Sequence, residues 1–161
     1  MKVTSGSGPS VRIELDHMEA GVMRELVQNM HTLIDSGTGK NDPVLERIFP
    51  AAYEDASEEQ RYQAVVGDSL REAKKEALAE VSAGLGDKGG VRVTLTEQEA
   101  STWLSVLTDM RLAIATRLDV TEEVMAADVD PSSPDAPALS VLHWLGWLQE
   151  SMLEALQTQK E

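Results

Sequence analysis

Apolar residues recur every three or four positions along most of this chain, the spacing that places them on one face of a helix. The predicted helices cover residues 17–34, 43–48, 57–83, 97–118 and 136–157. Gly37 and Gly39 are expected to end the first helix. The second is short and begins with Asp42 as the N-cap and Pro43 as the first helical residue, a combination typical of a helix start. A capping pattern at Ser57 opens the third.

Two short segments favour β-strands instead. Residues 11–15 and 91–95 belong to a pair of similar stretches, and each is followed by a capping box, with Asp16 and Thr96 as the caps. Because a single short strand is not stable alone, we expect the two to pair as a ribbon. The alternative is that the likeness reflects only a shared capping pattern. The predicted fold class is mainly α, a single-domain bundle of about five helices with a two-stranded β-ribbon.

We expect one helical domain over residues 11–158, preceded by a flexible segment over residues 1–10. An acidic linker that contains prolines, residues 119–135, separates the last two helices, and it holds one predicted helical turn over residues 121–126. Asp135 is expected to cap the last helix.

The negative charge of the chain makes some kinds of binding partner less favourable than others. Its 14 Lys and Arg face 28 Asp and Glu, a formal net charge of −14 over 161 residues. DNA affinity rests largely on cations that neutralise phosphates, so this charge argues against a bare phosphate-binding surface, although a minority basic face stays open. The most basic helical face carries Arg71, Lys74 and Lys75, and Glu72 and Glu76 dilute it.

The sequence contains no cysteine, which excludes disulfides, thiolate metal sites and cysteine nucleophiles together. Its three histidines, His17, His31 and His143, lie on different predicted helices or near their caps, and no paired-histidine motif is present. We therefore assign no catalytic, cofactor-binding or metal-binding residue, and we do not expect an enzyme.

The first ten residues and the apolar runs of the sequence do not look like targeting signals. The first ten residues lack the apolar stretch of a secretory signal. The densest apolar run, Leu142–Leu148, is far shorter than the roughly 20 residues that a membrane span requires. A cytoplasmic protein without membrane contact is the expectation.

One charged residue breaks the apolar pattern of the fourth predicted helix. Arg111 falls among Leu107 and Leu118 on the helical wheel, inside the buried stripe. An unpaired buried charge is very costly. We therefore expect a structural ion pair between Arg111 and an acidic residue on another helix, with Glu80 or Asp68 as candidates. The alternative is a ligand-binding arginine.

Trp147 breaks the pattern of the last helix in the opposite sense. It lies opposite the apolar stripe and among polar residues, with His143 beside it and Trp144 at the border. Because tryptophan is enriched at the centres of interfaces, these three residues are candidate contacts for a partner. The alternative is a central helix that packs on both sides, or a linker that folds over Trp147.

Three segments carry a family resemblance. Residues 42–53, DPVLERIFPAAY, are similar to the pattern DP…RLFP.AY, and residues 93–118 follow LT..EA..WL..L.D.RL…RL. Residues 142–156 match a closing WL…QE.L…L. In this order the patterns resemble an actinobacterial family with a domain of unknown function, also called AosR-like, over about residues 11–157.

The resemblance implies a cytoplasmic transcriptional regulator that works with an alternative sigma factor of RNA polymerase to promote cysteine-biosynthesis genes. It also implies redox sensing by a C-x-x-x-C pair, which a chain without cysteine cannot carry. Methionine can oxidise in principle. The helix-spaced Met18, Met23, Met30 and Met110 are better explained as core residues.

These observations rank the candidate functions. The first is an oxidative-stress transcriptional regulator that acts by protein–protein contact with a sigma factor or RNA polymerase. The alternatives are a regulator that binds DNA directly, and a helical adaptor or scaffold without catalysis. An enzyme acting on small molecules ranks last. A homodimer formed through the last helix is left open.

Overall fold

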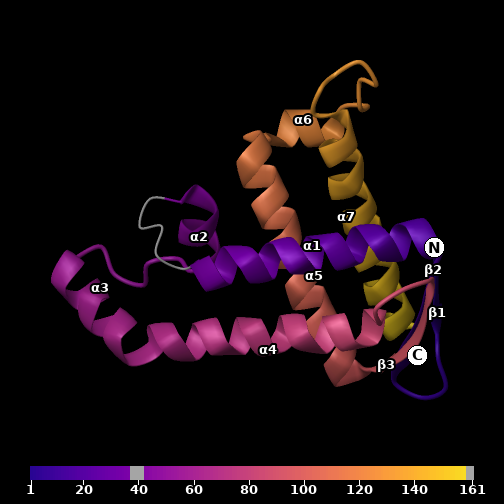
Figure 1. Cartoon of the computed structure of the whole chain (residues 1–161), viewed down its shortest axis with the longest axis horizontal. Coiled ribbons are helices and arrows are strands. Elements are labelled where there is room, and N and C mark those ends of the chain that lie inside the picture. Colours follow the sequence, from indigo (N-terminus) through magenta and orange to yellow (C-terminus); the bar gives the residue numbers. More distant parts are fainter. Residues whose placement is uncertain (37–41, 159–161) are drawn as a thin grey trace.

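The structure is a computed structural model that describes residues 1–36 and 42–158, and it confirms a mainly helical fold with a small antiparallel sheet (Figure 1). The elements in chain order are β1 (Lys2–Ser5), β2 (Ser10–Leu15), α1 (His17–Ser36), α2 (Pro43–Ile48), α3 (Ala56–Tyr62), the π-helix η1 (Gln63–Gly67), α4 (Asp68–Leu85), β3 (Val91–Thr96), α5 (Glu97–Leu118), α6 (Glu122–Ala126) and α7 (Ala136–Gln157). Gly37 and Gly39, expected to end the first helix, lie outside the described residues.

The sheet has the order β1-β2-β3, and both pairings are antiparallel. Val11 pairs with Leu95, so the predicted ribbon between residues 11–15 and 91–95 is confirmed. The third strand, β1, lies within residues 1–10, which we expected to be a flexible segment. Only Val3 in this strand is apolar, so no alternating pattern marks it in the sequence.

Two strand–cap–helix units, β2–α1 and β3–α5, give the sheet its connection to the helices. Glu19 N donates to Asp16 Oδ1 at 2.8 Å, and Asp16 N donates to Glu19 Oε2 at 2.8 Å. Thr96 and Glu99 make the same reciprocal pair at the start of α5. Both predicted capping boxes are confirmed, and each satisfies backbone N–H groups that a helix start leaves without partners.

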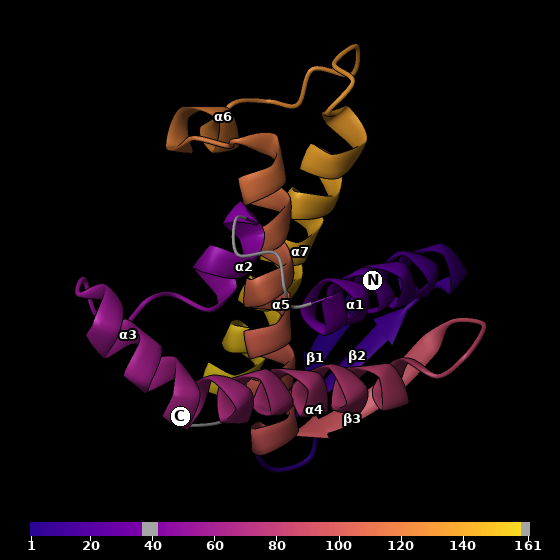
Figure 2. The same cartoon turned by 60° about the vertical axis from the view of Figure 1, so that its left-hand side comes forward.

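Helix α5 lies at the centre of the core, between α4, α2 and α7 (Figure 2). Its predicted inward residues Trp103, Leu107 and Met110 are 1% exposed or less. The sheet contributes one apolar face to the same core, formed by Val11, Ile13, Leu15, Val91 and Leu95. Met18 was expected in the core but is 79% exposed, because it stands in the first turn of α1 where no other element covers it.

The predicted long helix over residues 57–83 differs most from the structure. Its N-cap is Asp55 rather than Ser57, because the Asp55 carboxylate accepts the N–H groups of the first turn. The π-helix η1 then separates α3 from α4, and π-helices widen the turn by one residue. α3 buries no residue and lies at the far end of the molecule from the sheet (Figure 1), so burial on α4 begins only at Leu78.

The last two helices follow the prediction in extent. α6 forms within the acidic linker, with Thr121 Oγ1 accepting the N–H of Val124 at 3.3 Å. α7 begins at Ala136, as expected. Asp135 occupies the N-cap position but makes no capping hydrogen bond with its side chain, because its backbone is already helical, at φ −87° and ψ −6°. In residues 1–36 and 42–158, no helix combines the length and apolar character that crossing a membrane requires.

The contact between α4 and α5 yields a stability prediction. A Cβ at Gly84 would lie 2.7 Å from Cζ2 of Trp103, whose ring is buried and has little room to move. Gly84→Ala should therefore lower the free energy of unfolding by about 1–3 kcal/mol in a urea titration.

Gly21→Ala is the matched control, because a Cβ at Gly21 in α1 meets no atom within 4 Å. It should raise stability by about 0.5–1 kcal/mol, the ordinary gain from alanine in a helix interior. Equal effects of the two substitutions would contradict the assigned packing.

Candidate functional site

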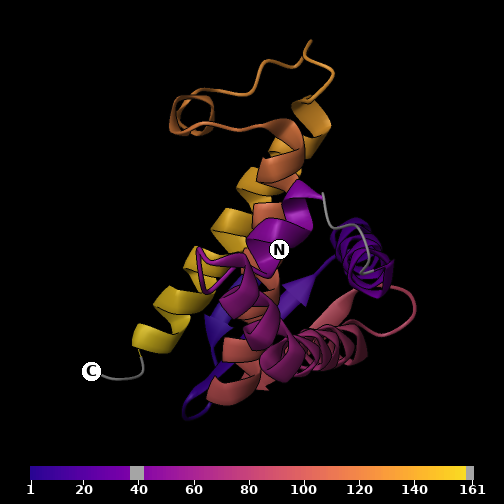
Figure 3. The ribbon, with the colours of Figure 1, turned by 90° about the vertical axis from the view of Figure 1, so that its left-hand side faces the viewer.

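Trp147 is the large apolar side chain on the outer face of α7, and 58% of it is exposed. α7 runs beside α5, and α6 lies at one end of this pair (Figure 3). A hollow of about 680 Å³ lies next to Trp147. It is lined by residues of α5, α6 and α7: Thr108, Arg111, Met125, His143, Gly146, Trp147, Gln149, Glu150 and Leu153. The exposed position predicted for Trp147 is confirmed, and we treat this hollow as the candidate site.

The floor of the hollow is a polar bridge between α5 and α7. Arg111 Nη1 donates to Gln149 Oε1 at 2.8 Å. Gln149 Nε2 donates in turn to Thr108 Oγ1 at 2.8 Å and to the Leu104 carbonyl at 3.1 Å. Gln149 is 9% exposed, so these bonds are partly shielded from water. A buried amide with both ends satisfied holds the two helices in one register.

Gly146 makes room for this bridge. A Cβ at that position would lie 3.3 Å from Arg111 Nη2 and 3.4 Å from Cζ, so the guanidinium lies against the backbone of α7. Neither Gly146 nor Gln149 was singled out in the sequence. Gln149 did carry a signal, because it falls within the apolar stripe formed by Leu145 and Met152.

The structure gives Arg111 a partner different from the expected ones. We predicted an ion pair with Glu80 or Asp68, but both carboxylates are exposed on α4. Arg111 instead points toward α7, where an uncharged amide accepts its hydrogen bond. Arg111 Nε is buried, and no described residue accepts from it. The helical wheel showed that Arg111 is inside, but not which neighbouring helix it faces.

The other two candidate contact residues divide between two surfaces. His143 lines the hollow beside Trp147, and its Nε2 is buried without a hydrogen-bond partner among the described residues. Trp144 lies instead in a smaller groove of about 250 Å³ between α1 and α7, next to Met18 and Val22. Trp147 and His143 thus share the candidate site, whereas Trp144 faces α1.

The segment that supplies most of this site is strongly acidic, and one of its carboxylates, Glu150, lines the hollow. From residue 118 to residue 158 the chain has eight carboxylates and no Lys or Arg. All eight are exposed: Asp119, Glu122, Glu123, Asp128, Asp130, Asp135, Glu150 and Glu154. Such a surface attracts basic groups and repels acidic ones.

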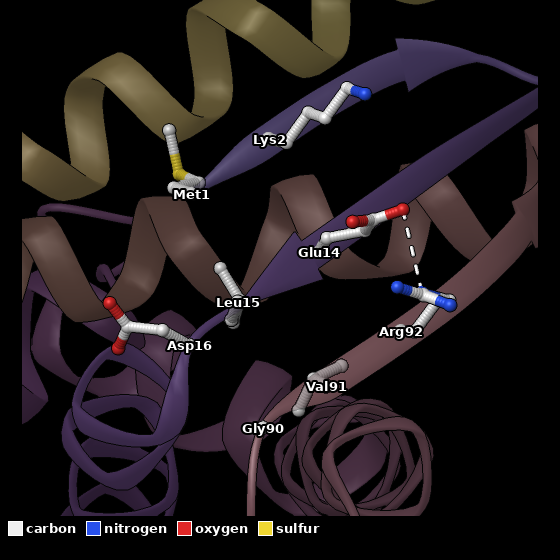
Figure 4. A pocket seen from close by; sticks show the side chains of 8 residues that line it. All are labelled: Met1, Lys2, Glu14, Leu15, Asp16, Gly90, Val91 and Arg92. Atoms are coloured by element: carbon white, nitrogen blue, oxygen red, sulfur yellow. Dashed lines mark ion pairs between the residues drawn. The ribbon is translucent and has the colours of Figure 1, made fainter.

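A second hollow, of about 520 Å³, lies on the exposed face of the sheet (Figure 4). Lys2, Glu14 and Arg92 form one row across its three strands. Arg92 Nε lies 3.5 Å from Glu14 Oε1. Together with the exposed Arg12, these residues make a small basic face in an acidic protein. Part of its charge is neutralised by Glu14, so we do not choose it as the principal site.

The cations of the basic face predicted on the third helix bind to neighbouring helices of the same protein. Lys74 Nζ lies 2.8 Å from Asp109 Oδ2 on α5, and Lys75 Nζ lies 2.9 Å from Asp35 Oδ1 on α1. The Lys75 hydrogen bond lowers the pKa of the Asp35 carboxyl and raises the pKa of Lys75 itself. Arg71 Nη1 donates to the Ile34 carbonyl at 3.1 Å. These three cations join α4 to its neighbours.

In the part of the chain that the structure describes, no three His, Asp or Glu side chains are arranged to hold a metal ion. Fold and site together define an acidic, mainly helical protein with an exposed tryptophan beside a polar hollow. The chain belongs to the DUF2017 family, a domain of unknown function, whose match covers residues 1–156. This confirms the resemblance described above.

Two relatives cover nearly the whole chain. The oxidative stress regulator AosR of Mycobacterium tuberculosis strain H37Rv is 26% identical over an alignment that includes 96% of this chain and 86% of that protein. AosR of Mycobacterium bovis gives the same identity and coverage. No solved structure shows significant similarity to this chain.

The polar bridge can be tested by removing its amide. Gln149→Leu keeps the volume but removes the acceptor of Arg111 Nη1 and the amide that donates to Thr108 and to the Leu104 carbonyl. We expect the free energy of unfolding to fall by about 2–3 kcal/mol, measured by urea titration. Gln28→Leu, at an exposed position of α1, should change it by less than about 0.5 kcal/mol. A loss no larger than that of the control would refute the bridge.

Proposed function

We propose that this protein is an oxidative-stress transcriptional regulator that acts by contact with a protein of the transcription machinery, a sigma factor or RNA polymerase. The observation that carries the proposal is the alignment with AosR, which includes 96% of this chain and 86% of the relative. An alignment of that extent covers the sheet, the helices and the Trp147 surface together. It therefore supports a shared role for the whole fold.

The structure supports contact as the mode of action. Trp147 offers a large, rigid apolar side chain of the kind found at the energetic centre of interfaces, and Leu153, 47% exposed, extends the apolar area. The polar bridge beneath holds α7 in place, so little conformational entropy is lost when a partner binds. The exposed carboxylates of residues 118–158, with Glu150 at the hollow itself, favour a partner with Lys or Arg around an apolar centre.

How the protein would sense an oxidant is a separate question from how it contacts a partner. Without cysteine, this chain cannot form a disulfide, so any response to oxidants has to use another side chain or another protein.

Direct DNA binding is the second candidate, and the observations support it less. The cations of α4 that would serve it are held by Asp109, Asp35 and the Ile34 carbonyl. The exposed sheet face offers Lys2, Arg12 and Arg92, too few cations for strong binding at physiological salt.

Trp147→Ala should weaken binding to the partner by about 30-fold or more, because truncating a central interface tryptophan typically removes at least about 2 kcal/mol. The measurement is calorimetric titration of the purified protein with RNA polymerase core and with each sigma factor of the same organism, one at a time. Affinity should also fall as salt increases, because salt screens the attraction between a basic partner and the exposed carboxylates of residues 118–158.

Val65→Ala is the control, since Val65 is 79% exposed on η1, at the other end of the molecule, and should leave affinity unchanged. Both substitutions should alter the free energy of unfolding by less than about 0.5 kcal/mol. Strong, salt-sensitive gel shifts of DNA by the protein alone, with no binding to polymerase or sigma factor, would favour the second candidate instead.

A further inference from the structure

All side-chain sulfur in this protein is methionine, and its seven residues differ sharply in exposure. Met23, Met30, Met110 and Met152 are at most 4% exposed, and the side chain of Met1 is 2% exposed. Met18 is 79% exposed, and Met125 is half-buried. Thioether oxidation by a dissolved oxidant requires access to the sulfur, so Met18 and Met125 are the reactive positions.

Met125 lies where its oxidation would affect the contact between α6 and the rest of the protein. α6 is five residues long, and the other four are exposed, so Met125 is its side chain that turns toward the body of the protein. It lines the hollow beside Trp147 and also a neighbouring hollow of about 610 Å³ between α5, α6 and α7. Arg111 lines both hollows as well.

Arg111 has a hydrogen-bond donor that an oxidised methionine could use. Its Nε–H is buried, and no described residue accepts from it, although Nη1 is bonded to Gln149. A thioether sulfur is a weak acceptor, whereas a sulfoxide oxygen is polar and accepts strongly. A buried donor without an acceptor is unfavourable, so an acceptor placed next to it is stabilised there.

We propose that Met125 is an oxidation site at which hydrogen peroxide controls the Trp147 surface. A lone pair of the Met125 sulfur attacks one peroxide oxygen, an S–O bond forms, the O–O bond breaks and water leaves. The sulfur loses two electrons and the peroxide gains them. The sulfoxide oxygen then accepts a hydrogen bond from the Arg111 guanidinium, which holds α6 at the rim of the hollow.

Holding α6 there fixes Glu122, which lines the neighbouring hollow together with Arg111, and a fixed carboxylate strengthens the attraction for a basic partner. This regulatory step rests on the proposed function, whereas the oxidation and its effect on α6 belong to the protein alone. Met18 does not share this role, because it lies in the groove near Trp144, away from Arg111.

The test uses the full chain with Met18→Leu, so that Met125 is the one accessible thioether, treated with hydrogen peroxide. Peptide mass spectrometry should show Met125 sulfoxide forming at least about tenfold faster than sulfoxide at the four buried core methionines. Amide hydrogen exchange over residues 119–135 should slow by about fivefold after oxidation, the effect expected of one new hydrogen bond.

Two variants connect the slower exchange to the proposed contact. Met125→Leu, on the same background, should show no change with peroxide. Arg111→Lys should still be oxidised at Met125 but lose the slowing, because lysine lacks the Nε–H group. Should Arg111→Lys fail to fold, the Arg111 Nε–H resonance of the Met18→Leu protein is the substitute readout, and it should shift on oxidation.

Oxidation of Met125 at the rate of the core methionines would overturn the proposal, and so would unchanged exchange in oxidised protein. Slowing that persists in folded Arg111→Lys, or an unshifted Nε–H resonance, would overturn the role of Arg111. None of these measurements involves a partner. Failure of the proposed function would appear separately, as no binding of reduced or oxidised protein to polymerase or sigma factor.

Discussion

A guanidinium that lies between two helices has to be given hydrogen-bond acceptors, and this requirement organises the contact between α5 and α7. Gln149 meets it at Nη1 with a single amide that also reaches Thr108 and Leu104, while Nε has no acceptor among the described residues. Gly146 lets the guanidinium approach the backbone of α7. Because this bridge is directional, it sets the rotation of α7 more narrowly than apolar packing would. The outward position of Trp147 follows from that rotation.

The charges of the protein divide between two tasks. On α4 they are structural, since Lys74 and Lys75 are paired with carboxylates of α5 and α1. On α6, the linker and α7 the carboxylates are exposed, and residues 118–158 contain no Lys or Arg. Residues 118–158, which include Trp147, therefore carry a formal charge of −8 out of the net −14. A surface of this kind can select a basic partner and keep nucleic acid away.

Much of the fold could be predicted from local patterns. The extents of α2 and α5 and the capping boxes at Asp16 and Thr96 depend on neighbouring residues, so the sequence shows them directly. The pairing of residues 11–15 with 91–95 followed from their likeness and from the instability of single strands.

The predictions that failed concern features that depend on packing between segments far apart in the sequence. β1 has one apolar residue and exists because β2 offers it an edge, and the partner of Arg111 is decided by which helix packs on which side of α5. Trp147 could be predicted from its place on the helical wheel. The hollow beside it needed Met125, Gly146 and Gln149 to come together from two helices that a linker separates.

The pairing of β2 with β3 has a consequence for how the protein is made. Val11 meets Leu95 across the sheet, so the ribosome has to synthesise more than eighty further residues before the central strand gains its second neighbour. During that interval Val11, Ile13 and Leu15 have no β3 to complete their apolar face, a state that invites association with other nascent chains. Two features reduce this association during synthesis. Both strands are short, and they carry charged side chains, a lysine in β1 and an arginine and a glutamate in β2.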